Sequence, residues 1–267
     1  MRIGVWQDET PSGGVGAARK IIAAALGEAK ADGVDILVFP ECFLTGYYRD
    51  AAEVSPCAAA VTPDEITALQ ALCDDTGIAF VLGSYLPTAA GTENVALVFR
   101  PATREPLIYR KRALFGEWEK TVFQAGSAPL LFDYKDTRFA VLICFDVEFP
   151  ELVREAAQAG AQAVLVPTAL MAPEHWVPDI IVPARAIENK LTVAYANRIG
   201  DEGHFTYIGK SQISGTDVKN RVVHSTTASG LISAELASDP KAMDYIREIN
   251  SQGLPRVGGA TEDLQPS

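Results

Sequence analysis

Three segments of the chain each place a chemically reactive side chain at or near the end of an apolar run. They are VFPECFLTGY (38–47) with Glu41, IYRKRALFGEWEK (108–120) with Lys111, and LICFDVEFPE (142–151) with Cys144. The nucleophilic form of a cysteine is the thiolate, so a catalytic cysteine needs a group that accepts its proton. None of the three segments contains a histidine. A carboxylate can serve instead, provided that burial raises its pKa toward neutrality.

The lysine would complete such a site. Its positive charge favours the thiolate and can stabilise an oxyanion, and the backbone N–H of Phe145 is a second candidate oxyanion donor. Glu41, Lys111 and Cys144 would therefore suit acyl transfer through a covalent thioester. Taken singly, each also fits an ordinary role: core packing for the cysteine, a helix cap or surface group for the glutamate, and a solvated basic triplet (110–112) for the lysine. Their joint occurrence favours catalysis.

The elements that must position these residues follow from hydrophobic periodicity. The predicted strands cover 2–7, 35–41, 78–85, 94–100, 105–111, 138–146, 163–168, 191–198, 207–215 and two further segments after residue 220. The predicted helices cover 17–33, 62–77, 150–160, 175–190 and 239–250, with a loop over 113–129. Alternating strands and helices predict a layered α/β fold, whose sites usually lie in loops after the carboxyl ends of parallel strands.

Composition limits the class of protein and of partner. The chain has 267 residues, of which 48% are hydrophobic, and a formal net charge of −11 with a pI of about 4.8. These values predict one domain over 1–250, followed by a tail of low apolar content over 251–267. An acidic surface argues against nucleic acid and against anionic membranes as partners.

The N-terminus and the cysteines indicate a compartment. MRIGVWQDE lacks the apolar core and cleavage site of a signal peptide. No segment approaches the ~20 apolar residues of a membrane helix, so we expect a cytoplasmic protein. There the four cysteines, none in CxxC spacing, should stay reduced. The three histidines do not cluster with them in a ligand-like spacing, so zinc is weakly supported. Acyl transfer through a thioester requires no metal or organic cofactor, and we expect none.

The three reactive segments resemble the signature segments of the nitrilase superfamily of carbon–nitrogen hydrolases. Four further segments are similar to that family, and the resemblance covers roughly residues 1–235: VPT (166–168), VPARAIENK (182–190), AYANRIG (194–200) and YIGKS (207–211). The resemblance implies a four-layer α-β-β-α sandwich that pairs into homodimers or larger homo-oligomers. It also implies that the helix after Cys144 and the tail 251–267 join the subunit interface, the alternative for the tail being a frayed end.

The resemblance assigns roles to individual residues. Glu41 would be the general base and acid, Cys144 the nucleophile, and Lys111 with the Phe145 amide the pair that polarises the carbonyl oxygen. A second glutamate, which positions substrate and lysine, matches Glu119 best. Three other positions qualify this match: Glu117 is the alternative to Glu119, Ala113 stands where the family commonly has His, and Ala125 where it commonly has Pro.

Other polar residues near the nucleophile are expected to support it. We expect Arg185, Glu188 and Asn197 to be buried structural groups that hold the cysteine loop. Asp146 and Glu148 are expected to orient that loop rather than to react.

The substrate follows only by analogy. LFGEWEK (114–120) and the segment 171–189 are similar to the branch that hydrolyses small aliphatic amides, which predicts conversion of a small amide to a carboxylic acid and ammonia. An N-carbamoyl amidohydrolase or a nitrilase on the same site, or a non-catalytic binding or scaffold member of the fold, are the alternatives. The residues expected to line the acyl pocket, with ordinary packing as the alternative for each, are Tyr47, Trp118, Thr168, Met171 and Trp176.

Overall fold

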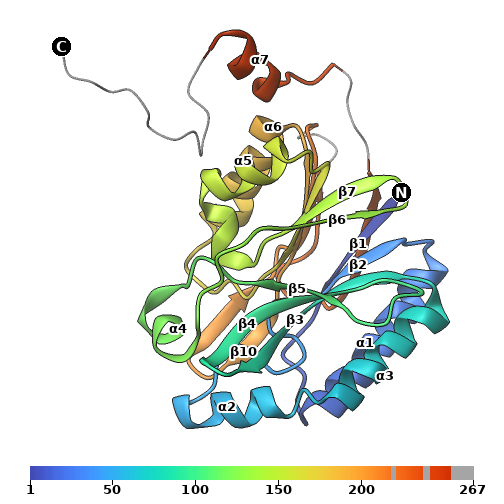
Figure 1. The fold of residues 1–267 in the computed structure, drawn as a ribbon, viewed down its shortest axis with the longest axis vertical. Coiled ribbons are helices and arrows are strands. Elements are labelled where there is room, and N and C mark those ends of the chain that lie inside the picture. Colours follow the sequence, from blue (N-terminus) through green and yellow to red (C-terminus); the bar gives the residue numbers. More distant parts are fainter. Residues whose placement is uncertain (218–220, 237–240, 254–267) are drawn as a thin grey trace.

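The computed structural model describes residues 1–217, 221–236 and 241–253 (Figure 1). Its centre is a pair of six-stranded sheets. The first sheet has the order β14 (Gly230–Glu235), β1 (Arg2–Gln7), β2 (Ile36–Val38), β3 (Ala79–Thr88), β4 (Gly91–Phe99) and β5 (Leu107–Arg110). The second has the order β13 (Val222–Val223), β12 (Gln212–Ser214), β9 (Thr192–Ala196), β8 (Ala163–Pro167), β7 (Thr137–Val141) and β6 (Leu130–Tyr134).

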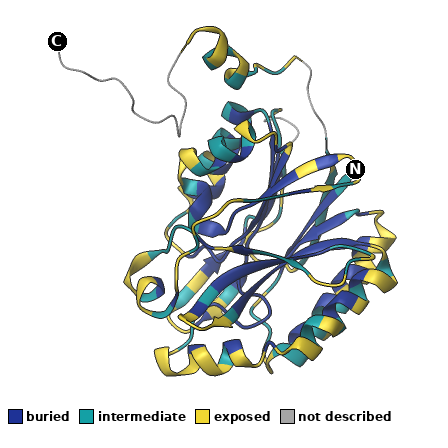
Figure 2. Ribbon diagram, viewed as in Figure 1, coloured by how far each residue is buried: buried dark blue, intermediate teal, exposed yellow. Residues whose placement is uncertain are grey.

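Helices cover the outer faces of both sheets. In Figure 1, α1 (Val15–Ala31) and α3 (Pro63–Thr76) lie outside the first sheet, and α5 (Pro150–Gln158) and α6 (Val182–Asn189) lie outside the second. One apolar cluster joins α1 and α3 to the first sheet, whereas another fills the space between the sheets and reaches α5 and α6. The architecture is therefore the predicted α-β-β-α sandwich, with buried sheets and exposed outer helix faces (Figure 2).

Local sequence explains the main elements. The apolar run in β2 is buried on both faces, since Ile36 and Val38 contact the cluster between the sheets while Leu37 contacts the helix-side cluster. Helix α3 begins at an N-cap where the Thr62 side chain accepts from the Glu65 N–H, and it ends at a left-handed glycine. Helix α1 buries side chains with helical spacing: Ala18, Ile22, Ala25, Leu26 and Ala29.

The sheet directions bring the reactive segments to one end of the molecule. Strands β1, β2 and β3 are parallel, as are β7, β8 and β9. Strand β5 is reached from β3 through two antiparallel steps, so it runs in the same direction as β3. Glu41, Lys111 and Cys144 thus each follow the carboxyl end of a strand of like direction within its sheet. The Glu41 N–H donates to the Thr168 carbonyl at 3.2 Å, which joins the end of β2 to that of β8.

Several predicted elements were wrong in extent. The expected loop 113–129 contains helix α4 (Gly116–Val122), and neither α2 (Ala51–Ala59) nor β6 was predicted. The expected helix 175–190 begins with a π-turn, η2 (Val177–Ile181), before α6. The expected strand 207–215 is interrupted where Gly209 and Lys210 adopt φ values of 62° and 57°. It therefore splits into β12 and β11 (Phe205–Ile208), and β11 forms a separate hairpin with β10 (Ile199–Glu202).

The C-terminal predictions are only partly covered. Helix α7 (Tyr245–Ser251) lies within the predicted helix 239–250 except at its last residue. Most of the predicted tail, 254–267, lies outside the described residues. Within the described part of the chain, no helix combines the length and apolar character needed to cross a membrane.

Candidate active site

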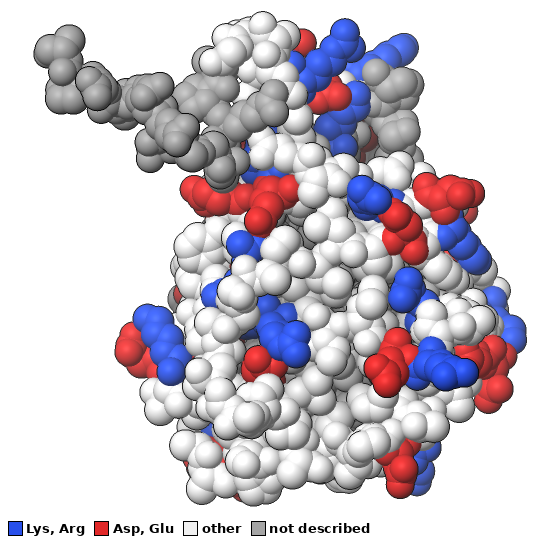
Figure 3. Space-filling model, viewed as in Figure 1, with Lys and Arg blue, Asp and Glu red and all other residues white. Residues whose placement is uncertain are grey.

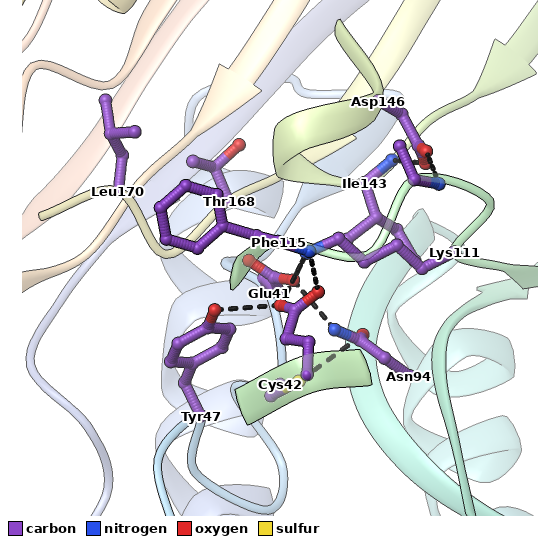
Figure 4. Close-up of polar contacts among 12 residues, drawn as sticks. Glu41, Cys42, Tyr47, Asn94, Lys111, Phe115, Ile143, Asp146, Thr168 and Leu170 are labelled. Carbon is purple, nitrogen blue, oxygen red and sulfur yellow. Dashed lines mark hydrogen bonds and ion pairs between the residues drawn. The ribbon is translucent and has the colours of Figure 1, made fainter. Parts of the chain in front are cut away.

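Lys111 lies fully buried between two carboxylates. Its Nζ is 2.7 Å from Glu41 Oε1 and 2.6 Å from Glu119 Oε1 (Figure 4). Burial alone would lower the pKa of Lys111, but the charges of Glu119 and Glu41 outweigh it and raise that pKa well above its usual value. The lysine is therefore an ammonium group, and it lies between two carboxyl groups.

The backbone of Glu41 is held by neighbouring segments. Its carbonyl accepts two hydrogen bonds from the buried Arg198 guanidinium, from Nε at 3.0 Å and from Nη2 at 2.6 Å. Its side chain is fully buried, and its Oε1 accepts from Lys111 Nζ and from Asn94 Nδ2, each at 2.7 Å. Its Oε2, by contrast, is buried without a hydrogen-bond partner. One oxygen of this carboxylate is thus anchored and the other is available.

Glu119 has no such available oxygen. Its Oε1 accepts from Lys111 Nζ at 2.6 Å and from the Tyr47 hydroxyl at 2.8 Å, and its Oε2 accepts from the Phe115 N–H at 2.7 Å. Burial, the largest cause, raises the pKa of Glu119; Lys111 lowers it and Glu41 raises it further. The saturated contacts suit a group that positions Lys111 rather than one that exchanges protons.

Glu117, the alternative second glutamate, points away from this cluster. It is exposed and its Oε1 is 2.9 Å from the Nζ of Lys120 on the surface of α4. The structure therefore brings Glu119, and not Glu117, to Lys111.

Cys144 begins the short helix η1 (Cys144–Glu148) with a φ of 46°. This left-handed conformation is unusual for a residue with a side chain, and such strain clusters at functional sites. Burial and the charge of Glu41 raise the pKa of the Cys144 thiol well above the usual value, against smaller opposing effects of Lys111 and of the Ala169 backbone. The resting group is therefore a thiol, which needs a base, and the charges of Glu41 and Lys111 both act on it.

Asp146 ties the cysteine loop to the loop after Lys111. Its Oδ2 accepts from the Ile143 N–H and from the Tyr109 hydroxyl, both at 2.9 Å, and its Oδ1 accepts from the Ala113 N–H at 2.7 Å. Ala113, which stands where the family commonly has His, thus contributes through its backbone N–H. As expected from the sequence, Asp146 orients the loop.

The other predicted supporting residues hold two different segments. Arg185 donates to the carbonyls of Val147 and Glu148 in η1 and pairs with Glu188 at 2.9 Å. Asn197 instead supports the segment after β8: it accepts from the Leu170 N–H and donates to the Gly209 carbonyl, each at 2.7 Å.

The predicted pocket residues do not form one group. Tyr47, Met171 and the partly buried Trp118 belong to one aromatic-rich cluster, in which the Tyr47 and Trp118 ring centroids are 5.5 Å apart. Thr168 is buried at the end of β8. Trp176 is 46% exposed and is not part of this cluster.

Sequence reasoning missed two buried residues that contact Glu41, namely Asn94 and Arg198. Each is a polar residue at the edge of an apolar strand, NVALVF (94–99) and LTVAYANR (191–198), and that position was the available signal. The described residues include no group of three or more His, Cys, Asp or Glu arranged to hold a metal ion. All four cysteines are free thiols.

Comparison with known proteins agrees with this arrangement. The model of the carbon–nitrogen hydrolase family matches residues 5–242. A hydrolase from the pqqF 5′ region of Pseudomonas protegens is 37% identical over 190 residues, which cover 70% of this chain and 67% of the relative. A nitrilase from Pyrococcus abyssi is 35% identical over 190 residues, covering 70% and 71%.

A solved structure extends the likeness to the whole fold. It is a variant of the amidase from Nesterenkonia sp. AN1 in which acrylamide has added to the active-site cysteine. It superposes with a TM-score of 0.82 at 31% identity and covers 95% of this chain and 100% of that one. From its matched segments, its fold and its relatives, the chain belongs to the carbon–nitrogen hydrolase family of the nitrilase superfamily.

Proposed function

We propose that this protein is a cysteine-dependent amidase that converts a small amide into a carboxylic acid and ammonia. The observation that carries the proposal is the unpartnered Glu41 Oε2, buried in the same cluster as the Lys111 ammonium and the Cys144 thiol. A free carboxylate oxygen, a fixed cation and a protonated nucleophile are the groups that acyl transfer needs. In the variant of the Nesterenkonia amidase, the active-site cysteine has added to acrylamide, which supports the assignment of a cysteine as the nucleophile.

In the acylation half, Glu41 Oε2 accepts the Cys144 proton as the sulfur attacks the amide carbon. The Lys111 ammonium and the Phe145 N–H stabilise the oxyanion of the tetrahedral intermediate. Glu41 then returns the proton to the amide nitrogen, the C–N bond breaks, and ammonia leaves behind a thioester on Cys144.

In the deacylation half, Glu41 takes a proton from water while the water oxygen attacks the thioester carbon. The same donors stabilise the second oxyanion. The C–S bond breaks, the carboxylic acid leaves, and Glu41 returns its proton to the Cys144 sulfur. Protons therefore move only among Glu41, sulfur, nitrogen and water, while Glu119 and Glu41 hold Lys111 in its charged form.

We further propose that Tyr47, Trp118 and Met171 bound the acyl side of the pocket, with Thr168 beside them and Trp176 near its rim. Their shared packing, or their place next to the reactive loops, supports this assignment. Tyr47, Trp118 and Met171 are bulky and present mainly apolar surface, which suits a short acyl chain.

The remaining expectations are also proposals. We propose a single domain, supported by the one apolar cluster that spans both sheets. We propose a cytoplasmic homodimer or larger homo-oligomer, supported by the exposed Phe149 (39%) at the start of α5, the helix after Cys144 that the resemblance places at an interface. On the face drawn in Figure 3, acidic and basic side chains are interspersed, which gives a polyanion no continuous basic surface there.

Ammonia release from a panel of amides, nitriles and N-carbamoyl compounds tests the activity. We expect turnover of small amides by the wild-type protein and none by Cys144→Ala, which should keep its fold. Mass spectrometry after iodoacetamide treatment should locate the modification at Cys144. Full activity in Cys144→Ala, or no ammonia from any compound in the panel, would overturn the proposal, and the second result would favour a binding or scaffold role.

A further inference from the structure

Asn94, on β4, contacts two of the residues assigned to catalysis. It is fully buried, its Nδ2 donates to Glu41 Oε1 at 2.7 Å, and its backbone carbonyl accepts from the Lys111 N–H at 2.9 Å. Figure 4 shows its amide directed at the carboxylate from the side of the first sheet. Nothing in the mechanism above uses this side chain.

The orientation of the Asn94 amide is set by Cys42. The Cys42 Sγ donates to Asn94 Oδ1 at 3.4 Å. Burial, followed by the charge of Glu41, raises the pKa of Cys42 well above its usual value, so this sulfur keeps its proton and acts as a donor. An amide whose oxygen is occupied by a donor must present its NH₂ group to the other side, where Glu41 lies.

The surrounding backbone leaves this group little freedom. A Cβ placed on Gly83 would lie 2.2 Å from the Cys42 nitrogen and 2.5 Å from the Pro40 carbonyl oxygen. Strand β3 therefore packs directly against the segment that carries Glu41. The Glu41 backbone and the Asn94 amide are both fixed, so the hydrogen bond between them determines the rotation of the carboxylate.

The two donors to Glu41 converge on one oxygen. Lys111 alone could follow a rotating carboxylate, because an ammonium group donates in three directions. A second donor from a different strand removes that freedom and leaves Oε2 as the unpartnered atom. Glu119 shows the contrast, because its donors are shared between both of its oxygens.

We propose that Asn94 is a positioning residue: by holding Glu41 Oε1 it fixes the rotation of the carboxylate, so that Oε2 stays free to exchange a proton, first with Cys144 and then with water. The inference rests on the proposed function. A neutral amide suits this position because it adds a hydrogen bond without adding charge to a cluster that already has two carboxylates for one ammonium.

The test compares Asn94→Ala with the matched control Asn189→Ala. Asn189 is also buried, and its Nδ2 donates to the Arg185 carbonyl in α6 at 2.9 Å, outside the cluster. For Asn94→Ala we expect kcat to fall by about 100-fold with KM changed by less than about threefold. The acidic limb of kcat/KM should move to higher pH, because the ionised carboxylate has lost a donor. Asn189→Ala should lower the melting temperature and leave the pH profile unchanged.

A second variant and a second readout keep the test decisive. If Asn94→Ala does not fold, Cys42→Ala keeps the Asn94 amide but removes the donor that orients it. We then expect a smaller fall in kcat with a pH shift in the same direction. Cys42→Ser, which keeps a donor, should restore the wild-type kcat and pH profile.

The rate of Cys144 alkylation by iodoacetamide, measured against pH, reports removal of the thiol proton without turnover. It can therefore support the role of Asn94 even if no compound in the substrate panel is hydrolysed. A folded Asn94→Ala with wild-type kcat and alkylation profile, or with a loss that leaves the pH profile unmoved, would overturn the inference.

Discussion

Two buried ionic clusters lie next to each other in this fold, and they are built differently. In the first, Glu202 accepts from Arg49 Nη1 at 3.1 Å, from the Tyr207 hydroxyl at 2.7 Å and from the Tyr47 N–H, with Arg198 Nη1 at 3.7 Å. Burial would raise the pKa of Glu202, but Arg198 and these donors outweigh burial and lower that pKa. Cations outnumber the anion, and both carboxylate oxygens have partners.

In the second cluster, around Lys111, two carboxyl groups share one cation. Glu41 keeps an unpartnered oxygen, and the pKa of Glu119 is raised rather than lowered. The clusters are joined through Tyr47, which contacts both Glu119 and Glu202. The cluster in which both carboxylate oxygens have partners therefore holds the surrounding segments, whereas the cluster with an unpartnered oxygen retains the capacity to move a proton.

The largest expected effect comes from Glu41→Gln, which removes the free oxygen from the second cluster. General acid–base catalysis contributes about 10²–10⁴-fold, and this residue acts in both halves of the reaction, so we expect kcat to fall by about 10³–10⁴-fold. Stability should change little, because the Gln can still accept from Lys111. Ammonia release and thermal melting measure both; a variant within tenfold of wild-type activity would remove Glu41 from the base role.

The next effect should appear in stability. Glu202→Gln leaves Arg198 and Arg49 without their shared carboxylate, and breaking a buried pair in this way typically costs about 3–5 kcal/mol. We expect urea unfolding to show that the free energy of unfolding falls by this amount. The acidic limb of kcat/KM, measured on the folded variant, should not move. Wild-type stability in this variant would contradict the structural role of the first cluster.

Glu119→Gln should give an intermediate loss of activity. Lys111 would keep its bond to Glu41 but lose one charge partner, and we expect kcat to fall by about 100-fold through misplacement of the ammonium. Glu117→Gln is the matched control two residues away, and its exposed pair with Lys120 should not affect kcat. Equal effects of the two substitutions in steady-state assays would argue against the assignment of Glu119.

The smallest effect concerns Glu148, at the end of η1. Burial, followed by the charge of Glu174, raises its pKa to about 7. A raised carboxyl pKa contributes stability below the unfolded value near 4.5, and this contribution is lost as the pH rises through about 7. At pH 8 the Glu148→Gln variant should therefore melt a few degrees above the wild-type protein. At pH 4, where Glu148 is protonated, the two melting temperatures should differ by less. Melting curves with the same difference at both pH values would contradict the raised pKa.

The second glutamate shows where prediction from sequence reached its limit. Residues 113–129 were expected to form a loop, in which the direction of a side chain cannot be predicted. The observed helix α4 separates Glu117 from Glu119 by about 200° of rotation, which turns one to solvent and the other to Lys111. The interrupted strand at Gly209 and Lys210 is a similar case, because backbone with positive φ follows from packing rather than from hydrophobic period.

Residue identity and order were enough to recognise the family and the types of the reactive groups, and hydrophobic periodicity was enough to predict a layered α/β fold. The four-layer sandwich followed from the resemblance to the family. Which oxygen of Glu41 is free could be seen only once the chain was folded. That property depends on a lysine 70 residues away and an asparagine 53 residues away, which reach the same carboxylate from different strands of the first sheet. Local sequence carries no information about the direction from which such distant donors approach.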